Sequence, residues 1–320
     1  MSATSGDGFL QELEGAFAEW ARARRDIRAV MVVGSQARTD HPADEWADLD
    51  LMIFTTDTKR YLSSDEWIRQ FGAVWVAARG RTVRGDPEWL VIFEGGVDVD
   101  FVFLPAGPIK WRLRILRGLM RVPGLLRILP REIHSQIQEA ASTTSEVFHR
   151  GVRVLVDRDR LIGTMRRVFG QESPQYEVEE TRFQDAVKSF WLTAARTAKK
   201  LRRGEWWVAK HRCDVLMKEL LRQMIEWHAR ATGGPSVDTW HGGHFLEEWA
   251  DPRAIEGLQS AFAVYDEDDI WRALLVTMEL YQWLAQETGE ALGYSYPSDA
   301  DMRIAGLVRR LESGRKSNIL

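Results

Sequence analysis

Aspartates occur in pairs, two residues apart, at two places in the chain. Asp48 and Asp50 stand in the run DLDLMIF, and Asp98 and Asp100 stand in the run VDVDFVFLP. Residues two apart on a strand project from the same face, so each pair can direct two carboxylates to one place. Hard divalent cations prefer carboxylate oxygens as ligands. We therefore expect Asp48 and Asp50, with a third carboxylate from the later strand, to form a two-metal site for Mg²⁺.

A Gly-Ser turn precedes the first aspartate pair. Gly34-Ser35 ends an apolar, β-branched run and is separated from Asp48 by twelve residues. Glycine lets the backbone approach phosphate closely, and Ser35 with nearby backbone N–H groups can bind phosphate oxygens. Metal-bound carboxylates neutralise triphosphate charge, activate a hydroxyl and stabilise departing pyrophosphate. Each motif alone is commonplace, but their order and spacing together predict nucleotidyl transfer.

The elements that must position these residues are readable from hydrophobic periodicity. Apolar residues recur at helical spacing over residues 9–21 and at strand-like spacing over residues 27–33 and 48–54. Two apolar runs around Gly95-Gly96 predict a β-hairpin, 89–93 with 97–104, and 152–156 resembles a last strand. Beyond about residue 160, helical periodicity takes over at 183–202, 207–231 and 268–292. The chain therefore divides into an α/β amino-terminal half and an all-helical carboxy-terminal half.

Composition narrows the class of protein. Hydrophobic residues make up 45% of the 320 residues and charged residues 28%, which is typical of globular domains. The net charge of −4 disfavours a dedicated nucleic-acid partner. No secretion signal and no apolar run of membrane-spanning length is visible, so we expect a cytoplasmic protein without a membrane partner. The single cysteine, Cys213, excludes an internal disulfide framework and a cysteine-cluster metal site.

A basic segment between Pro105 and Gly151 has two interpretations. Its apolar residues follow a helical stripe, with arginines mostly off it: Trp111, Ile115, Leu116, Leu119 and Met120. Such a stripe is typical of a membrane-surface or nucleic-acid patch, or of a solvated helix that packs over the cleft. Pro123 and Pro130 cut the segment into short pieces, which favours the packed helix.

Taken together, the motifs resemble the aminoglycoside 6-adenylyltransferases, the streptomycin-modifying enzymes of the polymerase-beta-like nucleotidyltransferase superfamily. The resemblance spans nearly the whole chain. It rests on Gly34-Ser35, Pro42, Asp44, Trp46, Asp48 and Asp50, on the runs 99–105 and 154–159, and on Phe190-Trp191, 198–201 and 292–297. It implies an α+β fold, with a mixed-sheet catalytic domain at 1–160 followed by a helical, substrate-binding bundle at 161–320. ATP and a small-molecule antibiotic acceptor are expected to meet between them.

The resemblance also implies site residues and a reaction. It selects Asp100 over Asp98 as the third metal ligand beside Asp48 and Asp50. It also implies that the nucleotide is bound by Gly34, Ser35, Arg38 and Lys199. Asp185 is a candidate general base. AMP would pass from Mg-ATP to a hydroxyl of a streptomycin-like aminoglycoside, with release of pyrophosphate.

The chain departs from the family pattern at three places. Gln36 stands where an arginine often follows Gly-Ser, Ser189 stands where an acidic residue often precedes Phe-Trp, and the segment 105–151 is longer than expected. The acceptor therefore stays open, with a lincosamide or a tRNA or protein hydroxyl as alternatives. A non-catalytic nucleotide-binding regulator is a further alternative, against which the three aspartates together argue.

Overall fold

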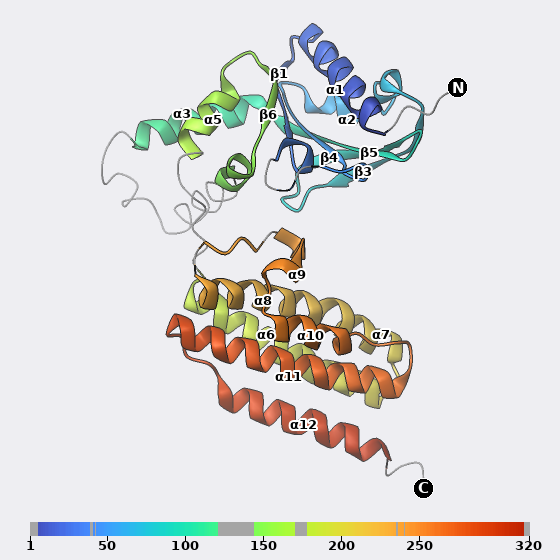
Figure 1. Cartoon of the computed structure of the whole chain (residues 1–320), viewed down its shortest axis with the longest axis vertical. Coiled ribbons are helices and arrows are strands. Elements are labelled where there is room, and N and C mark those ends of the chain that lie inside the picture. The colour runs from blue at the N-terminus through green and yellow to red at the C-terminus, as the bar shows by residue number, and fades with distance from the viewer. Residues whose placement is uncertain are drawn as a thin grey trace. The chain divides into compact units, whose positions relative to one another are not determined.

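The computed structural model describes residues 6–38, 41, 43–120, 144–169, 178–234, 236–239 and 241–316. The chain forms two compact units, Met1–Gln175 and Tyr176–Leu320 (Figure 1). The sequence predicts a boundary at residue 160. Helix α5 (Leu161–Phe169) lies in the first unit, where its buried side chains pack on strands β1 and β6.

A six-stranded mixed sheet forms the centre of the first unit. Its strands are β1 (Ile27–Val33), β2 (Leu49–Thr55), β3 (Val74–Arg81), β4 (Pro87–Phe93), β5 (Val97–Pro105) and β6 (Arg153–Asp157), in the order β3-β4-β5-β2-β1-β6. The β2–β5 pair is parallel, and the other four pairs are antiparallel. The hairpin and the strands expected near residues 27, 48 and 152 are confirmed. Strand β3 was not anticipated, because few of its side chains are buried and its pattern carries little periodicity.

An aromatic core covers one face of the sheet. Helix α1 (Gly6–Ala23) lies over this face together with the short helices α2 (Thr58–Leu62) and η2 (Ile68–Phe71). The ring of Phe17 lies 5.1 Å from that of Trp20 and 5.5 Å from that of Phe101 on β5. The inward residues of β2 and β5 alternate with outward ones, as the sequence pattern predicted. The buried face therefore fixes which residues of each strand face the opposite side.

The helices that the structure describes in this unit cover only part of the opposite face. Helices α3 (Ala106–Met120) and α5 pack over β1 and over the distal ends of β2 and β5. Leu90 and Ile92 on β4 remain 39% and 37% exposed. This uncovered part of the sheet also carries Asp50 and Asp100, at matching positions of β2 and β5.

Helix α3 contains the first part of the basic segment and corrects its predicted apolar stripe. Leu113 is buried, whereas Trp111 and Ile115 are 63% and 41% exposed. Helix α3 follows β5 directly, so the end of the strand fixes its rotation and turns Ala106, Ile109 and Leu113 toward the sheet. The described residues include neither Pro123 nor Pro130, and they do not include the side chains of Leu119 and Met120. In the part of the chain that the structure describes, no helix has both the length and the apolar character needed to cross a membrane.

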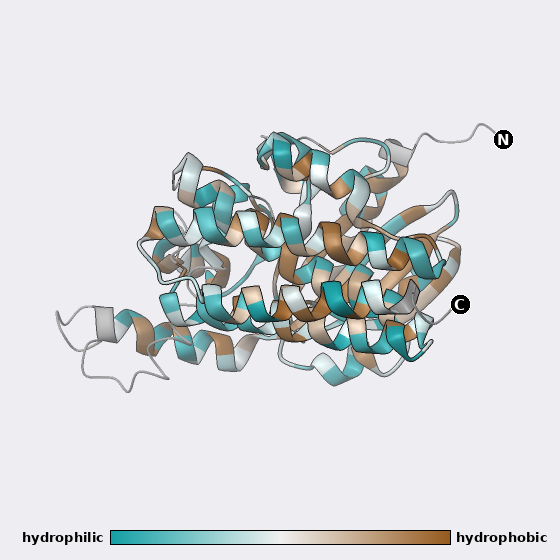
Figure 2. Ribbon diagram, turned by 90° about the horizontal axis from the view of Figure 1, so that it is seen from below, coloured by the Kyte–Doolittle hydropathy of each residue, from teal (hydrophilic) through white to brown (hydrophobic). Residues whose placement is uncertain are grey.

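The described residues of the second unit form helices joined by loops, with no strand among them. It contains α6 (Glu180–Arg202), α7 (Trp206–His211), the π-helical turn η4 (Arg212–Met217), α8 (Lys218–Gly233), η5 (His241–Gly243), α9 (Leu246–Trp249), α10 (Pro252–Ala261), α11 (Glu267–Leu292) and α12 (Ser298–Lys316). The three long helices expected from the sequence are confirmed, with η4 interrupting the second. Hydrophobic and hydrophilic residues alternate along these helices (Figure 2). At the centre of the bundle the ring of Phe190 stacks on that of Tyr281, with centroids 3.6 Å apart.

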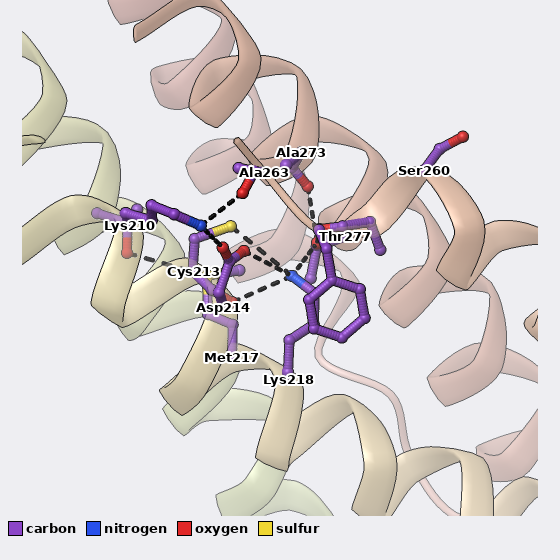
Figure 3. Close-up of polar contacts among 12 residues, drawn as sticks. Lys210, Cys213, Asp214, Met217, Lys218, Ser260, Ala263, Ala273 and Thr277 are labelled. Carbon is purple, nitrogen blue, oxygen red and sulfur yellow. Dashed lines mark hydrogen bonds and ion pairs between the residues drawn. The ribbon is translucent and has the colours of Figure 1, made fainter. Parts of the chain in front are cut away.

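A buried polar cluster joins η4 and α8 to α11 (Figure 3). The Lys218 amine donates hydrogen bonds to the carbonyl of Cys213, at 3.1 Å, and to the hydroxyl of Thr277, at 2.8 Å. Burial lowers the pKa of Lys218 and raises the pKa of Cys213 to about 11. The cysteine is thus a buried thiol that packs in the core.

Candidate active site

Three carboxylates converge where β2 and β5 run side by side. Asp50 on β2 pairs in register with Asp100 on β5, and Asp48 immediately precedes β2. One oxygen from each of these three side chains lies within 4.8 Å of the others. Asp98 is outside this group and is exposed. The structure therefore brings together the three aspartates that the sequence selected.

The electrostatics of this group favour a bound cation. Burial, followed by the charges of Asp48 and Asp100, raises the pKa of Asp50 to about 7. Burial, followed by the charges of Asp98 and Glu88, raises the pKa of Asp100 to about 7. Carboxylates held this close repel one another unless protons or cations neutralise them.

The Gly34-Ser35 turn lies directly against the carboxylates. Gly34 has φ +69°, in the region that glycine favours, and a Cβ atom there would lie 2.0 Å from Oδ2 of Asp50. The Ser35 hydroxyl donates at 3.4 Å to Oδ1 of Asp48, and Ser35 begins the short helix η1 (Ser35–Ala37). Two features explain why glycine is required here: the backbone conformation and the space for the Asp50 side chain.

Residues distant in sequence support this turn. Arg153 on β6 donates a hydrogen bond to the carbonyl of Gln36 at 2.5 Å and forms a two-bond ion pair with Glu14 of α1. Gly151 has φ +114°, and a Cβ atom there would lie 2.5 Å from the carbonyl oxygen of Ala37. A cavity of about 520 Å³ opens beside the Glu14–Arg153 pair. Sequence reasoning did not find these residues, because Glu14 and Arg153 are 139 positions apart.

Glu88 is a further carboxylate that sequence reasoning missed. It lies on β4, is 7% exposed, and has its pKa raised by burial and by the charge of Asp86. Its own charge contributes to the raised pKa of both Asp50 and Asp100. The expected strand began at Trp89, two residues after the start of β4 at Pro87, so Glu88 was not placed on the sheet. The hairpin register around Gly95-Gly96, extended by one residue, would have revealed it.

The other predicted residues are described within their own units. Arg38 is half-buried and follows η1, where its backbone N–H donates to the carbonyl of Ser35 at 3.4 Å. Asp185 and Lys199 both lie on α6 of the second unit and are exposed. The Asp185 carboxylate forms an ion pair with Lys188 at 3.4 Å. The roles suggested for these three residues stay predictions.

A Gly-Ser turn against Asp48 and Asp50, with Asp100 on the adjacent strand of a mixed sheet, is the arrangement of a nucleotidyltransferase. The chain belongs to the streptomycin adenylyltransferase family, whose model matches residues 10–311. It is 22% identical over 297 residues to an aminoglycoside 6-adenylyltransferase of Bacillus subtilis (strain 168), covering 90% of this chain and 92% of that protein. It is 25% identical over 279 residues to an aminoglycoside 6-adenylyltransferase of Campylobacter jejuni, covering 87% of each.

The crystal structure of an aminoglycoside 6-adenyltransferase from Bacillus subtilis aligns with a TM-score of 0.41 and 18% identity, covering 94% of this chain and 98% of that one.

Proposed function

We propose that this chain transfers AMP from Mg-ATP to a hydroxyl of a streptomycin-like aminoglycoside and releases pyrophosphate. The observation that carries the proposal is the group of Asp48, Asp50 and Asp100 against the Gly34-Ser35 turn. Family membership and the names of the relatives support an aminoglycoside acceptor.

The three aspartates are suitable ligands for Mg²⁺. They offer three hard oxygen donors within 4.8 Å of one another, and the pKa values of Asp50 and Asp100 are raised by burial and then by the charges of neighbouring carboxylates. Bound Mg²⁺ would supply the positive charge that neutralises the triphosphate and polarises the reacting oxygens.

Each residue of the site has a distinct proposed task. Gly34 lets the turn approach the triphosphate, and the Ser35 hydroxyl with neighbouring N–H groups binds its oxygens. Arg38 and Lys199 add positive charge for the phosphates. Asp185 accepts the proton of the acceptor hydroxyl as its oxygen bonds to the α-phosphorus and the bond to pyrophosphate breaks.

The negative charge of the chain favours a cationic acceptor. Aminoglycosides carry ammonium or guanidinium groups, which pair with carboxylates and lie over aromatic rings. The chain has a net charge of −4. A neutral lincosamide gains much less from such an environment, so we expect it to be a poor acceptor.

Pyrophosphate release from the purified protein tests the proposal. We expect release with ATP and streptomycin, and little release with GTP or with lincomycin. Asp50→Asn should lower turnover by orders of magnitude, whereas Glu45→Gln, the same loss of charge on an exposed neighbouring side chain, should leave it unchanged. Release with lincomycin but not with streptomycin would overturn the acceptor assignment. A fully active Asp50→Asn variant would overturn the metal-site assignment.

A further inference from the structure

The carboxylate of Glu88 shares a sheet face with the three aspartates. Across the β4–β5 pair, Leu90 lies opposite Asp100. Glu88 is two positions from Leu90 on the same strand, so the side chains of Glu88 and Asp100 leave the same face. Glu88 therefore lies diagonally beside Asp100 on the same face of the sheet.

The neighbouring strand makes room for this carboxylate. Gly80 on β3 lies directly opposite Glu88. A Cβ atom at Gly80 would lie 2.9 Å from Oε1 and 3.1 Å from Cγ of Glu88. Gly80 does not have a positive φ, so its backbone conformation does not require glycine. The space it leaves is occupied by the Glu88 side chain.

The Glu88 carboxylate has no partner of its own among the described residues. The side chain is 7% exposed, yet no hydrogen bond or ion pair to it is found there, and its charged neighbours Asp86, Asp50 and Asp100 are all acidic. An ionised carboxylate in such surroundings is costly unless a cation pairs with it. None of the described residues supplies such a cation, which leaves the carboxylate able to pair with a positive group on a ligand.

The chemistry of the site decides which ligand that is. A fourth negative charge repels the triphosphate, so Glu88 does not serve the nucleotide. Among the described residues, the group whose geometry suits a metal ion consists of Asp48, Asp50 and Asp100, without Glu88. An organic cation on the acceptor is the ligand that remains.

We propose that Glu88 binds a guanidinium or ammonium group of the acceptor and so holds the adjacent hydroxyl at the Asp48–Asp50–Asp100 group. This inference rests on the function proposed above. Streptomycin carries guanidinium groups beside the free hydroxyls of its cyclitol ring, and a guanidinium pairs with a carboxylate through two parallel hydrogen bonds. The exposed side chains of Leu90 and Ile92 lie on the same face and offer apolar surface to the ring.

Glu88→Gln tests this positioning role, because it keeps the shape of the side chain and removes its charge. We expect the KM for streptomycin to rise about tenfold to a hundredfold, the range for a lost charge-assisted hydrogen bond. The KM for ATP should stay unchanged, kcat should change less than the streptomycin KM, and the salt dependence of that KM should weaken. Glu94→Gln is the matched control, since Glu94 is an exposed carboxylate beyond the end of the same strand.

A second variant and a binding measurement keep the inference separate from the proposed function. Gly80→Ala retains the charge but displaces the Glu88 side chain, so the streptomycin KM should also rise. Calorimetric binding of streptomycin to the Mg-ATP-analogue complex should weaken in Glu88→Gln and persist in Glu94→Gln. Equal binding by wild type and Glu88→Gln, or a parallel rise in the ATP KM, overturns the inference. If wild type binds streptomycin through Glu88 but releases no pyrophosphate, the proposed function fails and the Glu88 assignment stands.

Discussion

Removing the carboxylate charge of Asp50 should make the metal-free protein more stable. In the folded chain the pKa of Asp50 is about 7, against 3.8 for an ordinary aspartate. Because the folded-state pKa is the higher one, the folded chain binds more protons than the unfolded chain between these two values. Ionisation of Asp50 therefore lowers the stability of the fold as pH rises from about 4 to about 7, and the loss is complete above that window.

The size of the effect follows from the shift in pKa. A shift of about 3 units corresponds to roughly 4 kcal/mol at about 1.4 kcal/mol per unit. The pKa values of Asp50 and Asp100 are both raised by burial first and then by neighbouring carboxylates, so the two shifts are coupled and cannot be added. Solvent screening reduces the figure further. We expect Asp50→Asn to stabilise the metal-free protein by about 1–3 kcal/mol at pH 8, and by less than half of that at pH 4.5.

Urea unfolding with a chelator present, followed by tryptophan fluorescence at both pH values, measures this difference. The exposed-site variant Glu45→Gln should show no gain at either pH. Added Mg²⁺ should stabilise wild type more than Asp50→Asn and so reduce or reverse the difference. A variant that is less stable than wild type at pH 8, or whose gain is the same at both pH values, would refute the reasoning from charge repulsion.

Three further predictions concern single residues. Gly34→Ala should abolish pyrophosphate release and lower the melting temperature, because its Cβ atom collides with a carboxylate and its φ is strained. Asp100→Asn should lower kcat severely and Asp98→Asn mildly, since only Asp100 belongs to the carboxylate group; the reverse order would show that the wrong ligand was chosen. Between pH 7 and pH 10 the melting temperature of Lys218→Met should gain less, or lose more, than that of wild type. Burial lowers the pKa of Lys218 in the folded state, so deprotonation removes a cost of folding; an unchanged slope would contradict this.

The sequence by itself determined the local parts of the site. Gly34-Ser35 after a β-branched run, and Asp48 with Asp50 two apart, are patterns of adjacent residues, and strand periodicity fixes which way their side chains point. The helical half was equally readable, since long amphipathic helices repeat over many turns. The choice of Asp100 over Asp98 came from the family resemblance, and the β2–β5 register agrees with it.

Only the tertiary structure decided what depends on pairing between distant segments. Gly80 makes room for the Glu88 side chain because β3 and β4 pair in the register that places the two residues opposite each other. The local sequence of neither strand indicates this register. The ion pair between Arg153 and Glu14 near the Gly34-Ser35 turn also joins residues that are distant in sequence. Helix α5 belongs to the first unit because its apolar face packs on β1 and β6. Periodicity reports which face of an element is buried. It does not report which partner buries that face, because the partner is selected by packing and hydrogen bonding over the whole fold.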